Sequence, residues 1–274
     1  MLIAIPSRSR ADKIAATIER LPPSVRPDVR VFVPESQWGR YARNLARFDK
    51  VKVVLLPDDF RMAEVRHFMG HWAADQGHDY FLMVDDDVRF ETRRGPDTTR
   101  TTACTHEDTV LCLEAIERRL DDGRWGMVGL QARQFQNAVP PGAPDEIFRE
   151  NTRNMCVTGW VTKDFLTVDY RRCVVRSDFD ATLQLLRQGR PNLNLCYWQH
   201  SQVNNVTGGC ADYRTTEVAD AAAHRLAELH PGLVRVVEKE YPAQARREKN
   251  NMGKRLEVVV NWQKAFGYDL RAVA

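Results

Sequence analysis

The sequence predicts an α/β fold in which a mostly parallel central sheet is flanked by helices. Two observations carry this prediction. Short apolar segments alternate with helical segments through the first third of the chain. One of these apolar segments runs into three consecutive aspartates, Asp85–Asp87, where a buried strand is expected to end. Ligands of such sheets bind at the carboxyl ends of the strands, so the aspartates are candidate binding residues.

The elements of the first third follow in order. Strands are expected at residues 2–6, 29–34, 51–57 and 80–84. Helices are expected between them, at residues 10–21, 37–48 and 62–76. The first helix is indicated by Ile14, Ile18 and Leu21, which recur at helical spacing on one face. Strand and helix repeated in this way imply a parallel sheet that is covered on both faces.

The rest of the chain has a more mixed pattern. Helices are expected at residues 106–120, 178–187 and 219–229, and strands at 125–130, 156–160, 194–198 and 234–237. Polar or Pro/Gly-rich loops are expected at residues 96–105, 137–144 and 202–209. The tail, residues 242–274, is first basic and then apolar.

Composition excludes several classes of protein. The chain has 274 residues, 43% of them hydrophobic and 28% charged, which fits a globular domain rather than a disordered chain. No apolar run approaches the ~20 residues of a membrane-spanning helix, and the opening apolar segment is too short for a signal peptide. Six cysteines occur without any C-x-x-C pair. We therefore expect a soluble protein of the cytoplasm, with no membrane contact and no obligate protein partner.

The aspartates indicate a site for a hard cation. Alternation along an extended chain sends Asp85 and Asp87 to the same side. Carboxylates favour Mg²⁺ or Mn²⁺, which keep positions open for water and phosphate oxygens. One aspartate can hold the metal while the other contacts a ribose or a metal-bound water. The plainer interpretation is a solvated loop.

These residues resemble the GT-A glycosyltransferases, whose D-x-D motif holds a divalent cation that bridges the diphosphate of a nucleotide-sugar. The resemblance implies metal ligation by Asp85 and Asp87 and donor binding by Asp85 and Asp86. It also covers the segment I-P-S-R-S-R after the first strand and the arginine of the helix before the aspartates. The donor-binding residues implied there are Pro6, Ser7, Arg8, Arg10, Glu35 and Arg66.

The resemblance continues downstream. V-T-G-W is similar to the acceptor-side segment, which implies acceptor contacts for Thr158, Gly159 and Trp160. R-S-D-F-D resembles the segment with the general base of inverting members, so Asp178 matches the base and Asp180 the later aspartate. N-L-C-Y-W-Q-H is similar to the strand with a late metal ligand, and His200 matches it.

A narrower resemblance is to the phage enzymes called TET-associated glycosyltransferases. It rests on the opening I-P-S-R-x-R-A-D-K, the V-F-V-P-E strand and the D-D-D variant. It implies transfer of a sugar from UDP-glucose or UDP-N-acetylglucosamine to 5-hydroxymethylcytosine in phage DNA, in the host cytoplasm. Two arginine-rich stretches, Arg89–Arg100 and Arg246–Arg255, could hold phosphates, although solvated faces often look the same. Trp160 or Tyr197 could stack on an extruded base.

The resemblance also divides the chain. Residues 1–240 are the expected glycosyltransferase domain, with a nucleotide-sugar half at 1–90 and an acceptor half with a smaller sheet at 91–240. Residues 241–274 are expected to form a basic, helical C-terminal extension that packs on the domain.

Three alternatives remain open at this point. A GT-A enzyme acting on a saccharide, protein or small molecule would transfer sugar without DNA. A non-catalytic nucleotide-sugar or nucleic-acid binding module would not need Asp178. A nucleotidyltransferase would normally have a glycine-rich loop after the first strand, and I-P-S-R-S-R-A-D-K has none. Stereochemistry is also open, because Asp178 would only orient the acceptor in a retaining enzyme.

Overall fold

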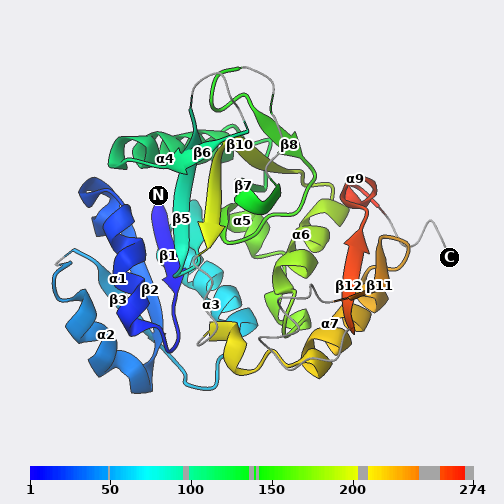
Figure 1. Cartoon of the computed structure of the whole chain (residues 1–274), viewed down its shortest axis with the longest axis horizontal. Helices are drawn as coiled ribbons and strands as arrows, with labels where there is room; N and C mark the ends of the chain where they lie inside the picture. The colour runs from blue at the N-terminus through cyan, green and yellow to red at the C-terminus, as the bar shows by residue number, and fades with distance from the viewer. Residues whose placement is uncertain are drawn as a thin grey trace.

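The computed structural model describes residues 1–48, 50–94, 99–135, 139, 142–202, 209–240 and 254–268. The sheet strands are β1 Leu2–Pro6, β2 Val29–Pro34, β3 Lys52–Leu56, β4 Tyr80–Val84, β5 Val88–Arg93, β6 Thr101–Ala103, β7 Met127–Ala132, β8 Phe148–Glu150, β9 Val157–Val161 and β10 Asn192–Gln202. They form one sheet in the order β3-β2-β1-β4-β9-β7-β10-β5-β6, with β8 paired to β10. The predicted fold class is confirmed (Figure 1).

The direction of the strands changes along the sheet. β3, β2, β1 and β4 are parallel, as the alternation of strands and helices predicts. β9 then runs antiparallel between β4 and β7, and β7 and β10 are again parallel. The amino-terminal end of β9 therefore lies at the same edge as the carboxyl end of β4. Thr158 and Met83 are opposite each other in this register, close to the aspartates.

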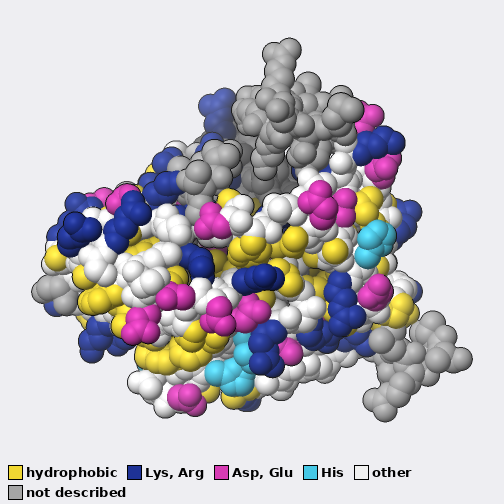
Figure 2. Space-filling view, turned by 90° about the horizontal axis from the view of Figure 1, so that it is seen from below, with side chains coloured by type: hydrophobic (Ala, Val, Ile, Leu, Met, Phe, Trp, Pro, Cys, Tyr) yellow, Lys and Arg dark blue, Asp and Glu magenta, His cyan; other side chains and the backbone are white. Residues whose placement is uncertain are grey.

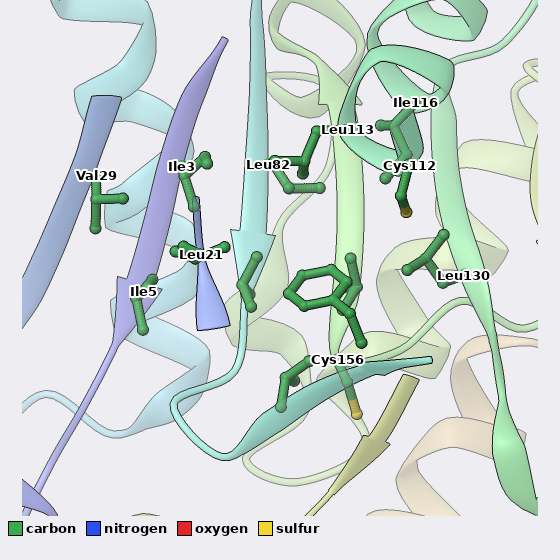
Figure 3. Packing of buried hydrophobic residues seen from close by; sticks show 14 of the residues in the cluster. Ile3, Ile5, Leu21, Val29, Leu82, Cys112, Leu113, Ile116, Leu130 and Cys156 are labelled. Atoms are coloured by element: carbon green, nitrogen blue, oxygen red, sulfur yellow. The ribbon is translucent and has the colours of Figure 1, made fainter. Parts of the chain in front are cut away.

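Helices cover both faces of the sheet. One face is covered by α1 (Ala11–Arg20), α2 (Trp38–Leu45) and α4 (His106–Asp121), and the other by α3 (Met62–Asp75), α5 (Thr162–Phe165) and α6 (Ser177–Arg187). Successive side chains of a strand point to opposite faces of the sheet, so each strand contributes to the core on both faces. Ile3 and Ile5 of β1 face α1, whereas Leu2 and Ala4 face α3. Figure 3 shows the first layer, where side chains of β1 and β4 pack with those of α4.

The C-terminal part forms a unit of its own beside α6. This C-terminal unit consists of α7 (Thr216–Leu229), β11 (Val234–Glu240), β12 (Lys254–Val260) and α9 (Trp262–Ala265), and β11 and β12 form a two-stranded antiparallel sheet. It lies at the opposite end of the molecule from β3 (Figure 1). Leu226, Leu233 and Ala265 of the unit are buried against Leu183 and Leu186 of α6.

Two expectations about elements need correction. Residues 254–260, expected in a helical extension, form strand β12, since the β-branched run Val258–Val260 favours a strand. The loop expected at residues 96–105 contains strand β6, which pairs with β5; residues 95–98 lie outside the described part of the chain. None of the helices in the described residues is long and apolar enough to cross a membrane.

Candidate active site

The three aspartates that follow β4 are bound by overlapping sets of side chains. Asp85 accepts a hydrogen bond from Arg66 of α3 over 2.9 Å. Asp86 turns inward, and its side chain is only 5% exposed. Asp87 accepts from Gln202, at the end of β10, over 3.0 Å and from Arg10 over 3.3 Å. The partners of Asp86 come from the loop after β1: Ser7 Oγ and Arg10 Nη1 donate to the Asp86 carboxylate over 2.5 and 2.8 Å.

The buried position of Asp86 has an electrostatic consequence. Burial raises the pKa of Asp86 to about 6, although Arg10 and the hydroxyl of Ser7 act in the opposite direction. Ser7 is itself buried and shares a hydrogen bond of 2.8 Å with the Tyr41 hydroxyl. Asp86 thus ties the loop after β1 to the loop after β4.

Asp85 and Asp87 fit a cation site. The amide nitrogen Nε2 of Gln202 lies 3.5 Å from Asp85 Oδ2 and 3.0 Å from Asp87 Oδ1, so both carboxylates approach one point. Paired carboxylate oxygens are suitable ligands for Mg²⁺ or Mn²⁺, with the other positions left to phosphate and water. Within the described ranges, no group of three or more His, Cys, Asp or Glu side chains could hold a metal ion.

His200 is not brought to this point. The register of β10 against β5 places His200 opposite Phe90, whereas Gln202 is opposite Val88, next to the aspartates. The His200 side chain is buried, and neither ring nitrogen has a hydrogen-bond partner among the residues that the structure describes. Burial lowers the pKa of His200 to about 4, so the ring is neutral at physiological pH. The side chain two residues later reaches the predicted metal site instead.

A second carboxylate lies across a small pocket from Asp85. Asp178, in the first turn of α6, lines this pocket together with Asp85, Arg66 and Thr158. Arg153 donates to Asp178 Oδ2 over 3.0 Å. Burial alone would raise the pKa of Asp178, but Arg153 and Arg66 outweigh it and hold that pKa below its usual range. The pocket therefore has an ionised carboxylate opposite the aspartate motif, with Arg66 near both.

The other predicted acceptor-side residues lie elsewhere. Asp180, predicted beside Asp178, is fully buried on the far side of α6, where it is bonded to His230, Gln184 and Arg172. Residues two apart on a helix point in nearly opposite directions, which separates it from Asp178. Trp160 is fully buried in the core against Phe165, so it cannot stack on a base. Gly159 faces α4, and a Cβ there would lie 2.8 Å from Ile116 Cγ2.

A narrow, largely apolar cleft lies at the ends of β1, β2 and β3. Its wall includes Pro6, Ser7 and Arg8 from the predicted donor-binding loop, and its apolar side chains are Phe32, Pro34, Leu56, Pro57, Phe60, Met62, Val65 and Tyr213. Arg8 is held there by the carbonyls of Asp58 and Phe60, at 2.8 and 2.9 Å. Glu35 follows β2 on the exposed surface and is not part of this wall.

The predicted phosphate-binding arginines are mostly engaged within the protein. Arg93 is buried and donates to the Cys196 carbonyl and to Gln131, and Arg94 is paired with Asp108. Lys254 and Arg255 are paired with Glu238 and Glu257, whereas Arg246, Arg247 and Lys249 lie outside the described residues. Figure 2 views the edge toward which β1 points in Figure 1; basic and acidic side chains alternate there around an apolar strip.

Sequence reasoning missed three residues of the site. Arg153 lies in an irregular segment before β9, with no local pattern to mark it. Gln202 ends a strand longer than the one expected, and Tyr213 reaches the cleft from a short turn at Gly209–Asp212, with its hydroxyl accepting from Met62 N over 3.2 Å. Only the packing of distant segments brings these side chains to the site.

One comparison with known proteins matches most of the chain. Residues 1–209 match the family model described as TET-Associated Glycosyltransferase. None of the curated proteins matches the sequence. Among solved structures, S. aureus TarS 1-349 in complex with UDP-GlcNAc is 12% identical at a TM-score of 0.46, over 83% of this chain and 67% of that chain. Mannose-1-phosphate geranyltransferase from Thermus thermophilus is 13% identical at a TM-score of 0.44, over 72% and 75%.

Proposed function

The chain belongs to the TET-associated glycosyltransferase family. We propose that it transfers a sugar from a UDP-sugar to the hydroxymethyl group of 5-hydroxymethylcytosine in phage DNA. The observation that carries the proposal is the placement of Arg66 beside Asp85, with the ionised Asp178 across the same pocket. This arrangement offers a donor side and an acceptor side within one small space.

The donor side is proposed to bind the nucleotide in two parts. The base would lie at the mouth of the narrow cleft beside Tyr213, where aromatic and proline side chains form the wall. The diphosphate would then lie at the ends of β1 and β4, near Arg10 and Arg66. Both arginines are largely buried, at 13% and 16% side-chain exposure, so their charges act in a medium of low polarity.

Asp85 and Asp87 are the proposed ligands of a Mn²⁺ or Mg²⁺ ion. When bound, such an ion supplies positive charge to the leaving diphosphate. Gln202 would have to give up its contact with at least one of the two carboxylates. Arg66 can keep its bond to Asp85 Oδ1, because the bond to Gln202 uses the other oxygen.

On the acceptor side, Asp178 is the proposed general base. The hydroxymethyl oxygen attacks the anomeric carbon, its proton passes to the Asp178 carboxylate, and the bond from sugar to phosphate breaks with its electron pair on the nucleoside diphosphate. Arg153 orients the carboxylate through the 3.0 Å bond to Oδ2. This role predicts inversion at the anomeric carbon; a retained anomer would leave Asp178 with acceptor orientation alone.

The experiment that tests the proposal is mass spectrometry of nucleosides. DNA that contains 5-hydroxymethylcytosine is incubated with the enzyme, Mn²⁺ and a panel of UDP-sugars that includes UDP-glucose and UDP-N-acetylglucosamine, beside an EDTA control. A hexose or N-acetylhexosamine mass shift that disappears in EDTA is the expected result. Hydrolysis of a UDP-sugar without modified DNA would keep the reaction class and overturn the DNA acceptor.

A further inference from the structure

A continuous cleft lies between the segment Arg149–Arg153 and the C-terminal unit, and Gln263 of α9 bridges it at one point by donating to two carbonyl oxygens of that segment over 2.8 and 3.2 Å. Two adjoining hollows share Arg149, Thr152 and Trp262 in their walls, so they form one cleft rather than two. One side consists of β8 and the residues after it. The other side consists of β11, the end of β12 and α9, which lies near β8 and the end of α6 in Figure 1.

The inner end of this cleft reaches the proposed base. Arg153 lines the inner hollow and donates to Asp178. Its guanidinium also stacks on the ring of Phe179, 3.9 Å from the centroid, and Trp262 packs on the same ring at 5.7 Å. Arg153, Phe179 and Trp262 thus form a layered wall that leads from Asp178 into the cleft.

The cleft carries unpaired positive charge. Arg149 and Arg235 are exposed on its two sides, and within the described residues neither has a carboxylate or carbonyl partner. The acidic residue of the wall, Glu150, is already bound to Arg124 over 2.7 Å. Trp262 is half-buried between the two hollows. Two free guanidinium groups around an accessible indole suit a chain of phosphates and flat bases.

We propose that this cleft binds a single nucleotide strand of the acceptor, with phosphates at Arg149 and Arg235 and a base on Trp262. The inference rests on the proposed DNA acceptor. It adds where the DNA strand lies and that the modified nucleotide is unpaired when it binds. A base inside a duplex could not bring its hydroxymethyl group to a carboxylate in so small a pocket, so the strand enters unpaired or with the nucleotide extruded. A neutral saccharide has no anionic group that could pair with the two arginines.

The two sides of the cleft have different origins in the sequence. Arg149 lies within the residues that match the family model, whereas Arg235 and Trp262 lie beyond residue 209. In this arrangement the matched part supplies the general base Asp178 and, apart from Tyr213, the proposed donor site, and the C-terminal unit supplies half of the proposed acceptor site.

The test combines a double variant with a matched control. Arg149→Ala/Arg235→Ala is compared with Arg43→Ala/Lys52→Ala, which removes two exposed positive charges from α2 and β3 at the other end of the molecule. A labelled single-stranded oligonucleotide with one 5-hydroxymethylcytosine is the probe. Binding is measured against salt concentration, the KM for the oligonucleotide is measured with saturating UDP-sugar, and UDP affinity is measured by calorimetry.

The cleft variant is expected to reduce the slope of log K against log salt by about 1.4, from two single-strand phosphate contacts at about 0.7 each. Its KM should rise at least about tenfold, while UDP affinity stays within about twofold, and the control should match the wild type. Trp262→Leu should weaken oligonucleotide binding roughly ten- to a hundredfold. Trp262→Leu also removes the contact between Trp262 and Phe179. Photocrosslinking of an iodouracil oligonucleotide to wild-type Trp262 therefore tests strand binding without any substitution.

Each alternative result has its own meaning. If the wild type modifies DNA but the cleft variant keeps the wild-type slope and KM, and no crosslink reaches Trp262, the cleft is not the strand site. If the wild type hydrolyses UDP-sugar yet neither binds nor modifies the oligonucleotide, the proposed DNA acceptor itself is wrong. Trp262-dependent binding of a neutral oligosaccharide, unaffected by the arginine changes, would assign the cleft to a saccharide.

Discussion

Arg66 donates to Asp85 over 2.9 Å and so joins helix α3 to the end of strand β4, beside the pocket that Asp178 lines from the other side. The positive charge of Arg66 acts on both carboxylates. Although burial lowers the pKa of Arg66, Asp85 and Asp178 raise it well above its ordinary value. The guanidinium is therefore always charged, and it is shared by the proposed donor and acceptor sides.

Asp178→Asn should stop transfer and spare donor binding. The amide cannot take the proton of the acceptor hydroxyl, and loss of a general base typically lowers a rate by about 100- to 10,000-fold. Steady-state transfer to 5-hydroxymethylcytosine DNA measures the rate, and calorimetry with UDP measures donor binding. A wild-type rate in this variant would remove Asp178 from the base role.

Arg66→Gln should weaken donor binding and change the pH dependence of transfer. Loss of a charge-assisted bond of about 1.5–3 kcal/mol corresponds to roughly ten- to a hundredfold weaker UDP affinity. Arg66 also helps to lower the pKa of Asp178, so that pKa should rise in the variant. The acid limb of the rate profile should then move to higher pH. Arg171→Gln, which removes an exposed arginine paired with Asp169, is the control and should change neither property.

Asp87→Ala and His200→Leu should differ in their affinity for Mn²⁺. Asp87 is one of the two carboxylates that converge on Gln202 Nε2, so its removal should abolish metal-dependent donor binding. His200 lies opposite Phe90 and is buried, so its replacement should leave manganese affinity unchanged. Calorimetric titration of Mn²⁺ in the presence of UDP measures both variants. Loss of manganese binding in His200→Leu would restore His200 to the ligand set.

His200 should also make the fold less stable in acid. Its pKa is about 4 in the folded chain, below the ordinary value of 6.5, so the unfolded chain binds the proton more readily. Its contribution is fully present above pH 6.5 and falls as the pH drops toward 4, by up to about 3 kcal/mol. Urea unfolding at several pH values should show a flatter profile for His200→Leu. Equal slopes in the variant and the wild type would contradict the buried neutral ring.

Gly70→Ala should destabilise the protein. An added Cβ on α3 would lie 2.0 Å from Cε1 of Phe165, whose ring belongs to the core between α3, α5 and β4. Overpacking of this kind costs about 1–3 kcal/mol of unfolding free energy, measured here by urea denaturation. Gly39→Ala in α2 is the matched change, since no atom lies within 4 Å of its added Cβ. It should be neutral or stabilising by up to about 1 kcal/mol.

The sequence predicts the strands and helices of residues 1–84 well and the positions of the side chains further along the chain poorly, for a physical reason. β1 to β4 and their helices depend on local alternation and periodicity, and the loop after β1 meets Asp86 because parallel strands end at one edge. The proposed acceptor side depends on strand register and on the direction in which each residue of α6 points. A shift of two residues separates Gln202 from His200, and the same shift separates Asp178 from Asp180. Arg153 reaches Asp178 from an irregular segment, which no short-range pattern describes.

The bond between Asp180 and His230 limits how the protein can be shortened or recombined. Asp178 and Asp180 sit on one helix, α6, but the second of them is bonded to a histidine that lies beyond the residues matched by the family model. A fragment that ends at residue 209 would retain the proposed base and lose His230, Leu226 and Leu233, which cover the outer face of α6. Exchange of the C-terminal unit between relatives would therefore require α6 to be exchanged with it.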